Sequence, residues 1–116
     1  MANNIVTLYV FMLESDGKIS VQDIKVKETE KRYSCIGDEQ MPFTYSCFVD
    51  KTQVGLTAFR SYMSIYYYSL DSSIEGFKEK VNELLEWEIG KLNKKIKRLQ
   101  EIGEAANKSF KKQYNI

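Results

Sequence analysis

Histidine is absent from this chain of 116 residues. Its absence removes the most common general base, the usual partner of a nucleophilic serine or cysteine, and the nitrogen ligand of most catalytic zinc sites. The six glycines form neither a phosphate-binding loop nor a dinucleotide fingerprint. Paired carboxylates could still act as acid and base, but no spacing selects such a pair. The sequence therefore predicts a protein that is not an enzyme and that needs no metal or cofactor.

Cysteine, proline and long apolar runs are also scarce. There are two cysteines, Cys35 and Cys47, and a single proline. No apolar run approaches the roughly 18 residues of a membrane span, and the first residues lack the basic and apolar segments of a signal peptide. We therefore expect the protein to remain in the cytoplasm of the cell that makes it, with both cysteines as reduced, half-buried thiols.

What is present fits one ordered domain over residues 1–116: 43% of the residues are hydrophobic, 13% aromatic and 28% charged. The pattern predicts an α+β fold, with an antiparallel sheet in residues 1–70 and a helical region in residues 71–116. Residues 4–13 form a β-branched and aromatic run, and Asp16 and Gly17 follow it as the tip of a hairpin.

The return strand is expected over residues 19–31, with a bulge near Asp23, where the apolar side of the strand changes. Two further short strands are expected at residues 33–36 and 43–49, on either side of a turn at residues 37–39. Residues 56–70 fit both a helical stripe and a strand face, and the aromatic cluster favours a strand over at least residues 63–69. The prediction is an antiparallel sheet of three to five strands.

A long helix is expected from about residue 73 to residue 111. Ser72 and Glu75 have the spacing of a capping box, and Asp71 adds favourable charge at the helix start. Such a helix would be about 60 Å long, roughly twice the width of the preceding sheet, so it cannot bury its apolar stripe against its own domain. It must pair with another chain, a second copy being the simplest candidate, or bend back at Gly90 or Gly103, where a shorter helix could begin.

The stripe advances in steps of three and four residues, as in a coiled coil or a helical bundle, with an irregularity around residues 87–90. Residues 71–90 carry a net charge of −4 and residues 91–112 a net charge of +6. These blocks complement the helix dipole and favour antiparallel pairing of two such helices. An ordinary solvated helix explains the same charges, and both interpretations stay open. The stripe consists of Ile74, Phe77, Val81, Leu84, Leu85, Ile89, Leu92, Ile96, Leu99, Ile102, Ala106 and Phe110.

A basic cluster lies within the predicted helix. Lys94, Lys97 and Arg98 are spaced by three and four residues beside Asn93, which places them together on one side. This arrangement suits phosphate but does not distinguish DNA, RNA and a small phosphorylated ligand. A net charge of +1 argues against a general nucleic-acid binder.

Aromatic residues are numerous, with eight tyrosines, six phenylalanines and one tryptophan. Most should lie in a core or an interface, yet the run from Tyr66 to Tyr68 must send rings to both faces of a strand. A ring on the outer face beside basic side chains could stack on an adenine. Arg60, six residues before this run, could reach the same region.

Taken as a whole, the chain resembles the phage anti-Thoeris proteins that sequester the cyclic ADP-ribose signal of that defence system. The resemblance rests on the opening hairpin at residues 6–17, the strand end at residues 67–70 that leads straight into a helix, and the amphipathic helix at residues 77–99. It covers nearly the full length without a short diagnostic motif. It implies an antiparallel sheet followed by C-terminal helices that mediate assembly into a dimer or higher homo-oligomer.

The resemblance also implies a function. Family members hold intact cyclic ADP-ribose isomers between protomers in the host cytoplasm, which blocks activation of the Thoeris effector, and some also bind cyclic oligonucleotides. Carried over to this chain, Phe77 or Tyr68 would stack on adenine, Asn93 would supply an amide, and Arg98 with Lys94 and Lys97 would bind phosphate. Only three arginines are present, so a site that needs two close arginines would draw on lysine or on a second protomer.

Two other classes of function remain. An oligomeric phage structural or scaffold protein would use the coiled-coil-like helix for assembly and bind no nucleotide. An enzyme that cleaves the nucleotide would need paired carboxylates, for example Glu83 or Glu86 with an aspartate of the first half, and it is the least favoured of the three.

Overall fold

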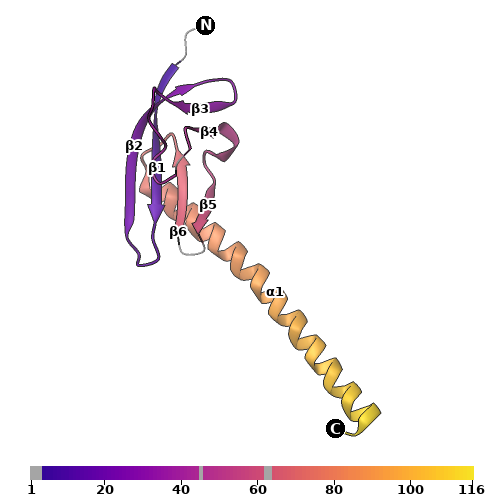
Figure 1. Cartoon of the computed structure of the whole chain (residues 1–116). Coiled ribbons are helices and arrows are strands. Elements are labelled where there is room, and N and C mark those ends of the chain that lie inside the picture. The colour runs from indigo at the N-terminus through magenta and orange to yellow at the C-terminus, as the bar shows by residue number, and fades with distance from the viewer. Residues whose placement is uncertain (1–3, 45, 62–63) are drawn as a thin grey trace. The chain divides into compact units, whose positions relative to one another are not determined.

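A computed structural model describes residues 4–44, 46–61 and 64–116. The chain divides into two compact units, Met1–Asn82 and Glu83–Ile116, and each unit is described by itself. The first unit holds a curled antiparallel sheet and the first turns of the helix that follows (Figure 1). The α+β prediction, with an N-terminal antiparallel sheet followed by a long C-terminal helix, is confirmed.

The sheet has six strands in the order β4-β3-β2-β1-β6-β5, which is more than the three to five predicted. All neighbouring strands are antiparallel. The central strand β1 contacts both the hairpin partner β2 and the last strand β6. The strands are β1 (Asn4–Leu13), β2 (Ile19–Glu28), β3 (Arg32–Cys35), β4 (Phe48–Asp50), β5 (Thr57–Ser61) and β6 (Ser64–Ser69).

The first hairpin forms as the sequence predicts. The Gly17 amide donates to the Glu14 carbonyl at 2.9 Å, and Gly17 adopts a φ of 87°, a conformation that glycine reaches without a steric penalty. β2 ends at Glu28, short of residue 31, and the bulge predicted near Asp23 is wrong because ten consecutive residue pairs join β1 and β2 without a shift. An irregularity lies instead in β5, between Phe59 and Ser61.

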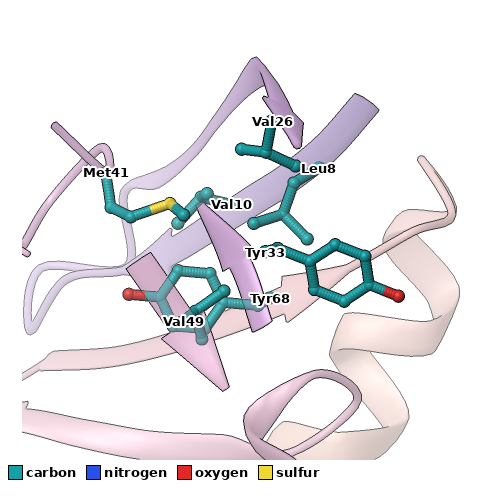
Figure 2. Close-up of a cluster of buried hydrophobic side chains, with 7 residues drawn as sticks. All are labelled: Leu8, Val10, Val26, Tyr33, Met41, Val49 and Tyr68. Atoms are coloured by element: carbon teal, nitrogen blue, oxygen red, sulfur yellow. The ribbon is translucent and has the colours of Figure 1, made fainter. Parts of the chain in front are cut away.

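The change of apolar side in β2 has a different cause, since the sheet carries apolar side chains on both faces. One face carries a cluster of buried side chains that includes Val26 of β2 (Figure 2). Ile19 and Val21, opposite Leu13 and Phe11 of β1, lie on the other face. The two ends of β2 therefore turn apolar side chains to different faces with an unbroken register. The cluster on the first face consists of Leu8, Val10, Val26, Tyr33, Met41, Val49 and Tyr68.

The strand predicted over residues 43–49 is largely wrong. Only Phe48–Asp50 pair as β4, and residue 45 lies outside the described residues. Phe43 adopts a φ of 66°, and the Met41 amide donates to the Ser46 carbonyl at 2.8 Å, which closes a loop in place of a strand. Pro42 has no amide proton for a ladder. Met41, only 2% exposed, anchors this loop in the first-face cluster.

Residues 57–61 and 64–69 form strands, so the strand interpretation of this ambiguous region is confirmed, except at Met63, which lies outside the described residues. The rings of Tyr66, Tyr67 and Tyr68 alternate between the two faces as predicted. Tyr66 and Tyr68 contact each other edge to face at 5.5 Å, whereas Tyr67 packs against Phe11 and Phe77 on the other face.

The helix α1 (Ile74–Tyr114) begins one residue later than the predicted capping box requires. The Ser73 hydroxyl, and not that of Ser72, accepts from the Gly76 amide at 3.4 Å, and the Asp71 carboxylate accepts from the Ser73 amide at 2.8 Å. Position N3 is therefore Gly76, which has no side chain to complete a capping box. The helix continues through Gly90 and Gly103, so the break considered at Gly103 is wrong.

Candidate functional site

The two aromatic residues proposed for adenine stacking are buried on opposite faces of the sheet. Phe77 is 2% exposed, and its ring stacks on Phe11 at 5.3 Å and on Tyr67 at 5.7 Å. Tyr68 is 4% exposed in the first-face cluster, and its hydroxyl lies 3.3 Å from that of Thr44. Burial raises the pKa of Tyr68. The structure thus gives both rings a packing role and does not bring them together.

The basic residues lie elsewhere. Asn93, Lys94, Lys97 and Arg98 are exposed on α1 in the second unit, whereas Arg60 is exposed on β5 in the first. Lys94, Lys97 and Arg98 form no ion pair with any described residue. The structure therefore places three neighbouring cations on the helix surface, with Glu101 one turn beyond them.

Sequence reasoning missed an aromatic residue on the same side of the helix. Trp87 precedes Lys91, Lys94 and Arg98 by four, seven and eleven residues, which at about 100° per residue places all four along one strip. We call these four residues the outer strip. The Trp87 side chain is 61% exposed, and the Lys91 ammonium lies 3.9 Å from the centre of its ring. The signal was available, because this spacing is visible in the sequence once the helix is known to be continuous.

The opposite side of the helix carries an apolar seam. Its spacing alternates between four and three residues with no irregularity at residues 87–90, the heptad pattern of a coiled coil. Leu92 is 57% exposed and Leu99 59% exposed, so the described chain leaves this surface open. We define the seam as Leu85, Ile89, Leu92, Ile96, Leu99, Gly103, Ala106 and Phe110.

An apolar groove of about 200 Å³ lies in the first unit, where the β1–β2 hairpin meets the first turns of α1. Leu13 and Ile19 line one side, and Ile74, Phe77 and Val81 line the other, with Glu75 and Lys78 as its charged residues. It is smaller than the roughly 300–1,000 Å³ of ordinary ligand pockets. Its apolar walls do not suit a phosphorylated ligand. Sequence reasoning could not find it, because it depends on the pairing of distant elements.

The two cysteines are free thiols, with Cys35 half-buried and Cys47 more exposed than predicted. The Cys35 amide donates to the Cys47 carbonyl at 2.8 Å. Burial, with smaller contributions from Cys47 and Glu39, raises the pKa of the Cys35 thiol, which disfavours the reactive thiolate. Cys35 therefore lacks the surroundings of an activated nucleophile.

Among residues 4–44, 46–61 and 64–116, no group of three or more cysteine, aspartate or glutamate side chains could hold a metal ion. None of the helical segments in this part of the chain combines the length and the hydropathy that a bilayer crossing requires. The chain matches no protein-family model, no curated protein and no solved structure.

Proposed function

We propose that this protein is a homo-oligomer that binds a cyclic ADP-ribose-type nucleotide through the outer strip and holds it without cleaving it. One observation carries the proposal. The exposed helix presents an apolar seam on one side, and on the other an exposed tryptophan followed by Lys91, which pairs with Glu88 at 3.2 Å, and by Lys94 and Arg98, which form no ion pair with a described residue. Assembly and nucleotide binding would use different faces of the same element, so each is compatible with the other.

The chemistry of the outer strip fits a nucleotide. The indole of Trp87 offers a stacking surface for a purine, and Lys94 and Arg98 offer charge-assisted hydrogen bonds to a pyrophosphate. Trp87 and Lys94 are separated along the helix axis by about 10 Å, comparable to the span from a base to its phosphates. Lys97 lies beside this strip, and Asn93 lies one turn before Lys97 and nearer to the seam. In this proposal Trp87 takes the stacking role that sequence reasoning gave to Phe77 or Tyr68.

Calorimetric titration of the purified protein with cyclic ADP-ribose isomers, and then with cyclic di- and trinucleotides, tests this function. We expect binding that weakens at least about tenfold in Arg98→Ala and in Trp87→Ala, because each removes a direct contact. Lys108→Ala removes one positive charge outside the strip and serves as the matched control. Chromatography of the ligand after heat denaturation should return it unchanged, whereas an altered ligand would indicate an enzyme.

A second candidate is an oligomeric structural or scaffold protein that assembles through this helix. The observation that favours it is the apolar lining of the groove beside the first turns of α1, which does not suit phosphate. This candidate predicts no heat with any nucleotide, and it predicts that Arg98→Ala assembles like the wild type. Absence of binding to every nucleotide tested would contradict the proposed sequestration and support the scaffold.

A further inference from the structure

The spacing of the seam is symmetric about a point between Lys97 and Arg98. From Leu85 to Phe110 its steps read four, three, four, three, four, three, four, which is the same in both directions. In two antiparallel helices centred on this point, residues whose numbers add to 195 lie at the same height. Every seam residue of one helix then meets a seam residue of the other, and Ile96 faces Leu99 at the centre.

Side-chain size distinguishes this arrangement from a parallel one. The seam contains two small residues, Gly103 and Ala106, in its second half. Antiparallel pairing places Gly103 across from Leu92 and Ala106 across from Ile89, so each small residue meets a large one. Parallel pairing in register would place Gly103 against Gly103, which leaves a gap where close packing is needed.

Charge favours the same arrangement independently. Residues 83–90 carry a net charge of −3 and lie opposite residues 105–112, which carry +3. Residues 91–96, at +3, lie opposite residues 99–104, at −2. Parallel pairing would instead place each block beside its own copy, with the helix axes about 8–10 Å apart, a distance comparable to the screening length. Opposite charges also favour the encounter of two copies in this orientation.

We propose that the segment from Leu85 to Phe110 pairs antiparallel with the same segment of a second copy, with a two-fold axis between Lys97 and Arg98. This inference rests on the self-association in the proposed function and adds its partner, direction and register. The partner is needed because a helix with an exposed apolar stripe gains most of its stability from packing. The outer strip stays exposed on both copies, because it lies opposite the seam.

Distance measurement between spin labels tests the register in the full-length chain. Cys35→Ser and Cys47→Ser provide a background without native thiols, and a single label is placed at Glu101→Cys or at Lys108→Cys. These two positions are seven residues apart on the same outer side of the helix, so they differ only in height. As a control, light scattering should show the same mass, and circular dichroism the same helix content, for each labelled variant as for the unlabelled background.

In the antiparallel pair the two labels at position 101 are offset along the axis by about 10 Å and those at position 108 by about 31 Å. We therefore expect a clearly longer distance at position 108. Equal distances at both positions would show a parallel pair and overturn the register while leaving self-association intact. If the protein with Cys35→Ser and Cys47→Ser is monomeric, both the register and the self-association are overturned. Calorimetry without nucleotide binding would contradict only the ligand part of the proposed function.

Discussion

At the scale of single residues, the environment of each aromatic ring decides what it can do. Phe77 and Tyr68 looked suited to ligand stacking in the sequence, but both are almost fully buried. Trp87, which sequence reasoning passed over, is exposed on the helix beside Lys91. Burial depends on tertiary contacts between strands and helix, so residue type and spacing could not separate these cases.

Replacement of Phe77 by alanine should destabilise the first unit. The substitution removes a ring enclosed by Phe11 and Tyr67, and we expect a loss of about 3–5 kcal/mol in the free energy of unfolding. Trp87→Ala is the matched control, because truncation of a mostly exposed ring should cost less than about 1 kcal/mol. Urea unfolding followed by circular dichroism measures both. Equal losses in the two variants would contradict the packing role of Phe77.

Tyr68 should make stability depend on alkaline pH. Its pKa in the folded protein lies above the ordinary value of 10.0, mainly because burial disfavours the phenolate. The unfolded chain therefore releases the proton first, and the free energy of unfolding should fall as the pH rises above about 10. Tyr68→Phe retains the ring and removes the ionisable group.

The difference in the free energy of unfolding between wild type and Tyr68→Phe should be constant below about pH 9. At higher pH the free energy of unfolding of the wild type should fall relative to that of Tyr68→Phe. Urea unfolding at a series of pH values measures this difference. Parallel pH profiles for the two proteins up to the end of the series would contradict the raised pKa.

At the scale of elements, local signals were sufficient where a segment interacts with its sequence neighbours. The first hairpin and the long helix follow from the Asp-Gly turn and the helical period, and both form. The loop around Met41 and the short β4 did not follow, because Met41 is buried by strands distant in sequence. The change of apolar side in β2 reflects apolar side chains on both faces of the sheet, and sequence reasoning took it for a bulge.

Glycine substitutions should have opposite effects in these two elements. Gly90 lies within α1, and a Cβ there would meet nothing within 4 Å, so Gly90→Ala should stabilise the helix by about 0.5–1 kcal/mol. Gly17 has a φ of 87° in the hairpin turn, so Gly17→Ala should destabilise the fold by about 1–2 kcal/mol. Thermal unfolding followed at 222 nm measures both. A destabilised Gly90→Ala protein would argue against an open, continuous helix at this position.

At the scale of the whole molecule, the sequence indicated that the helix needs a partner but not where its own domain ends. The first unit includes α1 as far as Asn82, with Phe77 and Val81 buried, and the seam begins at Leu85. The apolar stripe that contains Phe77 and Val81 ends at Leu84, and the seam begins at the adjacent Leu85. The residues proposed to bind phosphate, Lys94, Lys97 and Arg98, could be named from the sequence. That they belong to another unit than Tyr68 and Phe77 became clear only from the structure.

The measurement that tests the account most directly is the mass of the protein in solution, determined by sedimentation equilibrium at micromolar concentration. We expect the wild type to be a dimer or a larger assembly held by the seam of α1, and Ile96→Asp to dissociate because it places a charge at the centre of that seam. Lys94→Gln changes the opposite side of the same helix without reversing a charge and should assemble like the wild type. A monomeric wild type, or an Ile96→Asp variant that assembles unchanged, would contradict self-association through this helix.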